Sequence, residues 1–384
     1  WRLELVDQPM PESVAIERAR HALLDSVRRH FISDVPVGVF LSGGIDSTAI
    51  VALAREAGYR ELKTFCISFD DQRWNEGDLA ARTAKAFGTD HHDWRMTPEM
   101  GRDLLHGYLE SIDQPTCDGF NTYCISKLAH ESGLKVVLSG LGGDELFGGY
   151  ASFRSIPQFL NLHKGARLLG PLRGSAGRVI ESSARDPRLK RLGAFLASDG
   201  SVLAAHQAKR GFFTQRNGWR IAQAYVGQSA AAPPLHSSDS HFHQPTLADE
   251  ISEVEINRYM VNQLLRDSDV MSMAWGLELR VPFVDSWLVD SVGKTPARYR
   301  LANGKQLLLD AVPEVPEWVA NRPKRGFAFP FEEWIGEGWK QVFGELDQRS
   351  PVPLVTWYRR WCLLTLEHFL RSNKVDCPLL TTAA

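Results

Sequence analysis

The sequence predicts an α/β protein, with a doubly wound parallel sheet and a mostly helical C-terminal half. Three observations support this fold class. Short apolar runs rich in β-branched residues, such as residues 37–41 and 135–138, are typical of buried parallel strands. Helix-prone segments alternate with these runs, as they do where strands pair in parallel. Glycine-rich turns follow two of the runs directly, at the strand ends where α/β sheets bind ligands.

The composition is that of an ordinary globular protein. The chain has 384 residues, with 44 Lys and Arg against 46 Asp and Glu, and a formal net charge of −2. This balance favours neither a nucleic-acid-binding protein nor a membrane-surface protein. The sequence shows no apolar run of about 18 residues and no secretory leader. Its five cysteines never form Cys-x-x-Cys, so we expect reduced thiols in a cytoplasmic protein.

Hydrophobic periodicity places the elements in order. Residues 12–31 form a predicted amphipathic helix, with Leu23, Val27 and Phe31 on its apolar stripe. After the strand at 37–41 comes a helix-prone segment at 48–57, which is rich in Ala and Leu. Further strands are predicted at 62–69, 89–96 and 135–138, and further helices at 78–87, 98–111, 251–265 and 357–370.

The first glycine-rich turn indicates a phosphate site. Residues 42–47 read Ser-Gly-Gly-Ile-Asp-Ser between a strand and a helix. Such a turn places unpaired backbone N–H groups at a helix N-terminus, where the helix dipole also favours an anion. A Walker loop is excluded because the turn has no lysine, and no complete dinucleotide fingerprint occurs elsewhere. We predict a phosphate-binding loop, with an ordinary tight turn as the alternative.

The second glycine-rich turn brings two carboxylates to another strand end. It reads Ser-Gly-Leu-Gly-Gly-Asp-Glu-Leu-Phe-Gly-Gly-Tyr over residues 139–150. Glycine permits close approach of a ligand to the backbone, and Mg²⁺ usually takes one or two carboxylates plus substrate phosphates. We therefore expect Asp46 and Asp144 to share one Mg²⁺ at the edge of the sheet. The alternative is that Asp144 or Glu145 only caps a helix.

Four motifs occur in order along the chain. The first two are the glycine-rich turns, and the other two are Leu277-Glu-Leu-Arg-Val-Pro-Phe-Val-Asp285 and Arg322-Pro-Lys-Arg-Gly-Phe327. Together they resemble the synthetase domain of the glutamine-dependent asparagine synthetases, in the N-type ATP pyrophosphatase (PP-loop) superfamily. The resemblance extends from the start of the chain to about Trp334, and four ordered motifs are more specific than any one. It implies a pyrophosphatase core of the adenine nucleotide alpha-hydrolase type at 35–150. A basic helical insertion with a mobile loop would follow at 151–245, and a helical part at 246–384.

The resemblance implies an ATP-dependent ligase that works through an acyl-adenylate. A substrate carboxylate attacks the α-phosphorus of ATP, pyrophosphate leaves, and ammonia or an amine then displaces AMP. The implied catalytic set is Lys305 near the reacting phosphate, with Asp46 and Asp144 holding Mg²⁺. For Lys305 the alternative is a solvated lysine in a glycine turn. The implied ATP and pyrophosphate contacts are Leu41, Ser42, Gly43, Gly44, Asp46, Ser47, Ile67, Ser139 and Gly140, among which Leu41, Ile67 and Gly140 would line the adenosine pocket.

One departure from the family pattern bears on the substrate. The family usually carries a carboxylate at the third position of Ser-Gly-x-Gly, where this chain has Leu141. Leucine neither accepts a proton nor pairs with an ammonium, so another group takes that role or the substrate is not aspartate. Glu278 and Arg280 are candidate substrate contacts. β-Lactam synthetases and lasso-peptide cyclases also vary at this turn, so an amide-forming tailoring enzyme is the first rival.

The middle of the chain carries weaker signals. Over residues 151–220, Lys and Arg outnumber Asp and Glu by roughly four to one. This excess indicates either a surface that attracts ATP or an acidic partner, or a solvated helical insertion. Residues 229–245 form a predicted mobile loop that contains His236, His241 and His243. A metal site is not favoured there.

The function we predict is asparagine synthesis from aspartate, with ATP and Mg²⁺ as cofactors. No cysteine precedes Cys66 and the chain begins at Trp1, so we expect the N-terminal glutaminase domain to be absent and ammonia to come from a separate glutaminase domain or subunit. The other expected partners are a small-molecule carboxylate and ammonia or an amine, without nucleic acid or membrane, and a homodimer is left open. A non-catalytic nucleotide-binding module is the second rival.

Overall fold

The computed structural model describes residues 5–227, 244–323, 326–337, 339–375, 377 and 380. The chain divides into two compact units. Unit 1 comprises Trp1–Ser111, Asp118–Tyr150 and Gln244–Pro330, and unit 2 comprises Ile112–Cys117, Ala151–His243 and Phe331–Ala384. Unit 1 holds both glycine-rich turns, so its architecture positions the candidate site.

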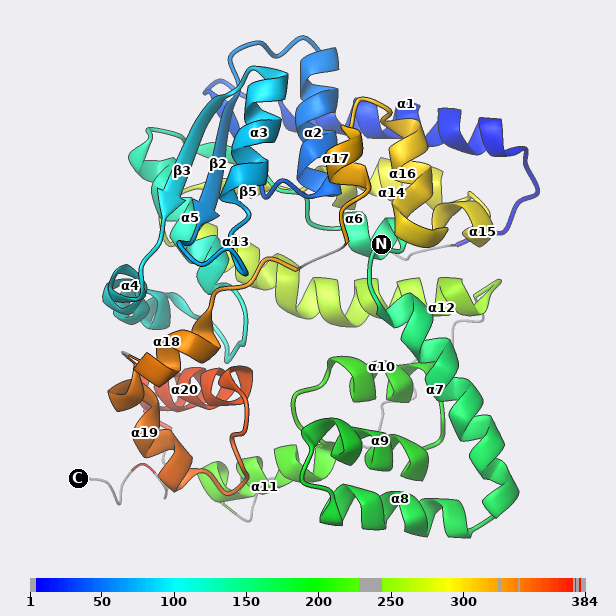
Figure 1. Cartoon of the computed structure of the whole chain (residues 1–384), viewed down its shortest axis with the longest axis vertical. Coiled ribbons are helices and arrows are strands. Elements are labelled where there is room, and N and C mark those ends of the chain that lie inside the picture. Colours follow the sequence, from blue (N-terminus) through cyan, green and yellow to red (C-terminus); the bar gives the residue numbers. More distant parts are fainter. Residues whose placement is uncertain are drawn as a thin grey trace. The chain divides into compact units, whose positions relative to one another are not determined.

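A parallel sheet forms the centre of unit 1 (Figure 1). Within the described residues it has five strands in the order β3-β2-β1-β4-β5, and every neighbouring pair is parallel. Gly38 of β1 stands opposite Lys63 of β2 on one side and Val137 of β4 on the other. The strands are β1 (Val37–Phe40), β2 (Lys63–Ser68), β3 (Asp90–Arg95), β4 (Val136–Leu138) and β5 (Glu278–Arg280).

Apolar side chains cover both faces of the sheet, which confirms the doubly wound α/β prediction. On one face, α1 (Glu12–His30), α2 (Ile45–Glu56) and α3 (Gly77–Phe87) pack in one core cluster with Val39 and Cys66. On the other, Ala129 of α5 (Phe120–Glu131) packs with Phe65. Phe65 and Cys66 are consecutive in β2, so their side chains point to opposite faces of the sheet. Both side chains are buried, and both faces are therefore covered.

Residues beyond 244 complete this core. Leu288 and Val292 of α14 and Leu308 of α16 belong to the same cluster as α1 (Figure 1). Residues 244–330 therefore group with the sheet, whereas the sequence division placed them in a helical part at 246–384. The other elements of unit 1 are α4 (Pro98–Ser111), α6 (Gly143–Phe147), α12 (Leu247–Val254), the π-helical η2 (Glu255–Leu265), α13 (Arg266–Met273), η3 (Pro282–Val284), α14 (Ser286–Gly293), α15 (Ala297–Arg300), η4 (Asn303–Lys305), α16 (Gln306–Ala311) and α17 (Glu317–Ala320).

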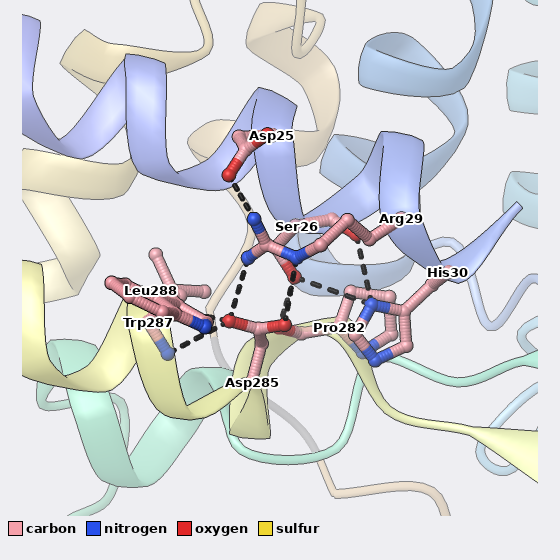
Figure 2. Close-up of polar contacts among 8 residues, drawn as sticks. All are labelled: Asp25, Ser26, Arg29, His30, Pro282, Asp285, Trp287 and Leu288. Carbon is pink, nitrogen blue, oxygen red and sulfur yellow. Dashed lines mark hydrogen bonds and ion pairs between the residues drawn. The ribbon is translucent and has the colours of Figure 1, made fainter. Parts of the chain in front are cut away.

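Polar contacts fix the carboxyl end of α1 to the segment that follows β5 (Figure 2). The Asp285 carboxylate accepts hydrogen bonds from the backbone N–H groups of Trp287 and Leu288, at 2.9 and 3.0 Å, and so caps α14. The same carboxylate pairs with Arg29 of α1 at 2.8 Å. Ser26 donates to the Pro282 carbonyl at 2.7 Å. The third sequence motif, residues 277–285, thus anchors α1.

The regular elements of unit 2 are all helices within its described residues. An aromatic cluster joins α18 and α20, where the Phe331 and Trp361 ring centroids lie 4.4 Å apart. The buried Glu367 of α20 accepts hydrogen bonds from Tyr225 at 2.6 Å and Arg349 at 2.8 Å. The helices are α7 (Ser152–Ala166), η1 (Arg167–Leu169), α8 (Leu172–Ser183), α9 (Pro187–Ala197), α10 (Val202–Arg210), α11 (Gln215–Val226), α18 (Phe331–Glu337), α19 (Lys340–Arg349) and α20 (Trp357–Ser372).

The element predictions hold closely in the sheet and less well after it. The predicted helix at 98–111 matches α4, and the strands at 62–69 and 89–96 match β2 and β3 within one residue at each end. The helix predicted at 251–265 is divided at Val254 between α12 and η2. The histidine loop with His236, His241 and His243 lies outside the described residues. No described helix has the length and hydropathy needed to span a bilayer.

Candidate active site

Both glycine-rich turns lie where the order of the strands reverses. From β1 the chain passes to β2 on one side, and it later enters β4 on the other side of β1. Ser42 follows β1 by two residues and Ser139 follows β4 directly. In parallel α/β sheets, ligands bind at the carboxyl ends of the strands at such a switch point.

The first turn has the geometry that the sequence predicts for a glycine-rich loop at a helix N-terminus. Gly44 caps the N-terminus of α2 without a side-chain hydrogen bond, so the first N–H groups of this helix have no side-chain cap. The Ser42 and Ser47 hydroxyl groups lie 3.2 Å apart across the turn. Gly43 has φ +70° and a Cβ there would lie 3.0 Å from the backbone N of Ala80, so the position requires glycine.

A lysine and two aspartates meet beside this loop. Lys305 Nζ lies 2.6 Å from Asp46 Oδ1 and 2.6 Å from Asp144 Oδ1. The lysine is 2 % exposed, and the two carboxylates are largely buried. The structure therefore brings together the three residues predicted as catalytic, from α2, α6 and the start of α16. A solvated Lys305 is excluded.

Glycines provide the room for this cluster. A Cβ on Gly143 would lie 2.3 Å from Asp46 Oδ1, and one on Gly149 would lie 1.8 Å from Asp144 Oδ1. A Cβ on Gly140 would lie 2.9 Å from that of Asp46. Each distance is far below van der Waals contact, so a larger residue at any of these positions would clash with one of the two aspartates.

Lys305 is held in an unusual backbone conformation. Its φ is +65°, in the left-handed region that side chains other than Gly, Asn and Asp rarely adopt. Burial lowers the pKa of its ammonium, but the charges of Asp46 and Asp144 outweigh burial, and the net pKa is raised. The ammonium is therefore charged at physiological pH.

A buried network fixes α6, the short helix that carries Asp144. Arg300 is fully buried, pairs with Asp249 at 2.5 Å and donates to the Leu146 carbonyl at 3.0 Å. Ser252 donates to the Glu145 carbonyl at 2.8 Å. The sequence analysis missed this network, because Arg300 and Asp249 lie in no glycine-rich or charged motif.

Glu145, next to Asp144, is a buried carboxyl group. It is 1 % exposed, and the Tyr150 hydroxyl donates to its Oε1 at 2.7 Å. Burial, with a smaller contribution from the charge of Asp144, raises the pKa of Glu145 to about 7, although the Tyr150 hydrogen bond opposes the rise. The Glu145 side chain is therefore buried and paired with Tyr150.

The residues predicted for adenosine lie at the same strand ends. Leu41 and Ile67 are 0 % and 1 % exposed, so their side chains belong to the core, and the Leu41 N–H donates to the Phe65 carbonyl at 2.8 Å. The Ser139 N–H donates to the Arg280 carbonyl at 2.9 Å, and Gly140 lies against Asp46.

The predicted substrate contacts are engaged elsewhere. Arg280 donates to the carbonyls of His30 and Ile32 at the end of α1, both at 2.8 Å, and pairs with Glu278 at 2.7 Å. These bonds place the Arg280 guanidinium against the end of α1. Leu141 lies half-buried in the turn before α6. Because its side chain is apolar, this position supplies no carboxylate.

The donor set fits Mg²⁺. Two aspartate oxygens converge on one ammonium, and carboxylate oxygens are the ligands this ion prefers. Among the described residues no group of three or more His, Cys, Asp or Glu could hold a metal ion. Asp46 and Asp144 would therefore supply two ligands and phosphate oxygens the rest, which is the usual pattern for Mg²⁺.

Comparison with known proteins agrees with this geometry. The model of the asparagine synthase family matches residues 18–374. Asparagine synthetase [glutamine-hydrolyzing] 1 of Bacillus subtilis is 33% identical over 88% of this chain and 53% of its own length. A putative asparagine synthetase [glutamine-hydrolyzing] of Mycobacterium bovis is 32% identical over 82% of this chain and 48% of its own length.

A fungal protein named amidase chry2, from Gibberella zeae, is 24% identical over 92% of this chain and 58% of its own length. The chain thus spans about half the length of the curated relatives it matches. The family match nevertheless covers both glycine-rich turns, Lys305 and most of unit 2. On this match, the chain belongs to the asparagine synthase family.

Proposed function

We propose that this chain joins a carboxylate to ammonia at the expense of ATP, through an acyl-adenylate, and that the carboxylate is aspartate. One observation carries the proposal: Lys305 lies between Asp46 and Asp144 beside a phosphate loop at the switch point of the sheet. This arrangement concentrates fixed charge where ATP phosphates would bind.

The first step needs charge stabilisation and little else. A carboxylate oxygen of the substrate attacks the α-phosphorus of ATP, the bond from that phosphorus to the β-bridging oxygen breaks, and pyrophosphate leaves with the electron pair. Backbone N–H groups at the start of α2 and the hydroxyls of Ser42 and Ser47 would hold the pyrophosphate. The Lys305 ammonium would offset the charge that develops on the bridging oxygen.

Mg²⁺, when bound to Asp46 and Asp144 together with the phosphates, would neutralise part of their charge. Lys305 Nζ already lies at the point where the two carboxylates meet. We infer that ATP draws this ammonium toward its phosphates and leaves the carboxylates to the metal ion.

The second step forms the amide. Ammonia attacks the acyl carbon, the bond from that carbon to the AMP oxygen breaks, and the nitrogen loses a proton. We propose that the ammonia comes from glutamine, on a glutaminase domain or subunit, because the names of the bacterial relatives specify glutamine hydrolysis and this chain matches only about half of their length. Leu41, Ile67 and Gly140 would hold the adenosine through their backbone.

One observation favours a second candidate, an amide-forming tailoring enzyme. Leu141 leaves the turn before α6 without the carboxylate that the asparagine synthetases usually carry. Such an enzyme would keep the adenylation step but take an amine, in place of ammonia, as the nucleophile. A non-catalytic nucleotide-binding module has no observation in its favour, because the three charged residues are intact and in contact.

ATP–pyrophosphate exchange tests the proposal. The chain with Mg²⁺ and aspartate is expected to incorporate labelled pyrophosphate into ATP, and an Asp46→Ala variant of unchanged fold is expected to lose the exchange. Exchange with another acid but not with aspartate would support the tailoring enzyme. If no acid in a broad panel supports exchange, the adenylation proposal is wrong.

A further inference from the structure

A cavity of about 360 Å³ lies in unit 1, outside the phosphate loop and the cluster of Lys305 with the two aspartates. It is formed by the loop after β2 and by the segment that follows α17. No residue in it belongs to the catalytic set or to the predicted substrate contacts. Its lining residues are Arg73, Trp74, Asn75, Glu76, Arg322, Gly326 and Ala328.

The first turn of α3 connects this cavity to the phosphate loop. Glu76 caps α3, and three residues later Leu79 packs against Gly43, where a Cβ would lie 3.0 Å from its side chain. The cavity is therefore at the carboxyl end of β2, next to the strand that leads into the phosphate loop. The opposite wall is held in place by Phe69, whose ring lies 5.1 Å from that of Phe329.

The wall of the cavity carries charges of both signs, among them a buried carboxylate and a partly exposed guanidinium. The Glu76 carboxylate is 9 % exposed and lies 3.2 Å from the Arg322 guanidinium, which is about one quarter exposed. An arginine fork matches a carboxylate in shape, and a buried carboxylate matches an ammonium. A ligand with adjacent positive and negative groups could separate the two side chains and pair with both. Its positive group would then bind Glu76 and its negative group Arg322, so neither charge would be left unpaired.

We propose that this cavity binds the head group of an α-amino acid substrate, with its ammonium on Glu76 and its α-carboxylate on Arg322. The proposal rests on the proposed function, because it leaves the side-chain carboxylate of aspartate as the group that reacts with ATP. It also accounts for recognition of aspartate in a chain with Leu141 and with Arg280 engaged at α1. The cavity is within the size range of small-molecule sites, roughly 300–1,000 Å³.

Substrates that lack one group of the head test the assignment. Exchange would be measured with aspartate, with succinate, which has no ammonium, and with β-alanine, which has no α-carboxylate. Glu76→Gln is expected to raise KM for aspartate at least about tenfold and to leave KM for succinate and for ATP unchanged. Arg322→Gln is expected to raise KM for aspartate and succinate but not for β-alanine.

Two further variants separate recognition from folding. Arg322→Lys keeps the charge and loses the fork, so it should fold as the wild type does and show an intermediate KM for aspartate. Arg102→Gln, at an exposed arginine of α4 outside the lining of the cavity, is the matched control and should leave each KM within about twofold. Equal changes in the KM for ATP and for aspartate in Glu76→Gln would overturn the proposal, as would no change in either.

Calorimetry distinguishes failure of this proposal from failure of the proposed function. If the wild type shows no exchange with any acid, titration of aspartate into the chain still tests the cavity. Binding to the wild type that weakens about tenfold in Glu76→Gln supports the cavity assignment without adenylation. Exchange with aspartate that is insensitive to both substitutions refutes the cavity and leaves the function.

Discussion

Among single residues, Lys305 is the one whose ammonium lies between Asp46 and Asp144, where Mg²⁺ would bind together with ATP. Replacing it by Met removes the ammonium and keeps most of the stem. We expect ATP–pyrophosphate exchange to fall by about 100-fold or more, since charge stabilisation of the leaving phosphate is lost. Asp46 and Asp144 would also lose their shared cation, so the midpoint of thermal unfolding should rise with added Mg²⁺ in the variant more than in the wild type.

Lys294→Met is the matched control for this experiment, because Lys294 is exposed at the end of α14. It should change neither the exchange rate nor the response to Mg²⁺. A Lys305→Met protein that exchanges pyrophosphate at the wild-type rate would remove the lysine from the catalytic set.

Gly143 is one of the glycines whose substitution should displace a catalytic carboxylate. A Cβ there would lie 2.3 Å from Asp46 Oδ1. Gly143→Ala is expected to lower exchange at least about tenfold and to cost about 1–3 kcal/mol of stability, as overpacking usually does. Gly218→Ala, in α11, meets no atom within 4 Å and should lose no activity. Equal activity of the two variants would contradict the close packing described here.

At the scale of elements, Asp285 joins three of them. It caps α14, pairs with Arg29 of α1 and ends the segment that follows β5 (Figure 2). Asp285→Ala should lower the free energy of unfolding by about 1–2 kcal/mol, because a helix cap and a partly buried ion pair are lost together. Urea denaturation measures this loss, and KM for ATP should stay unchanged.

Asp25→Ala removes the other partner of Arg29 and serves as the comparison. The Asp25 side chain is 62% exposed, so its pair with Arg29 is screened by water. We expect a change within about 0.5 kcal/mol. If the two substitutions cost the same, then Asp285 does not anchor α1.

The strands around the site could be predicted because each is a short apolar run that ends at a glycine or serine. β5 could not, because Glu278, Leu279 and Arg280 show neither an apolar run nor β-branched residues. Its position depends on pairing with β4, a contact across 140 residues of sequence that local periodicity does not contain. For the same reason Arg280 was predicted as a substrate contact, and its bonds to the end of α1 appear only in the folded chain.

For the molecule as a whole, pH should act on stability through Glu145. Its pKa in the folded state is about 7, above the ordinary value of 4.5, so the folded state binds more protons between these values. The contribution of this group to stability is therefore fully present below pH 4.5 and is lost as pH rises through about 7. Without Mg²⁺ or nucleotide, Glu145→Gln should be stabilised relative to the wild type increasingly from pH 5 to 8.

Urea unfolding of Glu145→Gln and of the wild type from pH 5 to 8 gives the difference between their free energies of unfolding. This difference is expected to change by on the order of 3 kcal/mol at most. Glu17→Gln, with a 73% exposed side chain on α1, is the control and should show no such trend. A constant difference between Glu145→Gln and the wild type would mean that the carboxyl is already ionised at pH 5.

The catalytic set could be predicted from sequence because each member belongs to a motif of glycines and charges. The residues that hold this set in place could not, since Arg300, Asp249 and Ser252 become a network only when α12 and α15 meet beside α6. The cavity at Glu76 and Arg322 is a similar case. Its two charges are 246 positions apart and come together through the packing of Phe69 on Phe329.

The distance along the chain between Asp46 and Lys305 has a consequence for biosynthesis. The two residues are 259 positions apart, so a ribosome that adds 5–20 residues per second needs roughly 10 to 50 s to pass from one to the other. The last 161 of these positions follow Asp144, so during that later part of the interval the nascent chain carries both aspartates without the lysine that balances them. A divalent cation captured by the two aspartates in that window would serve as a temporary substitute for the lysine. Cellular Mg²⁺ would then act on the maturation of this protein as well as on its catalysis.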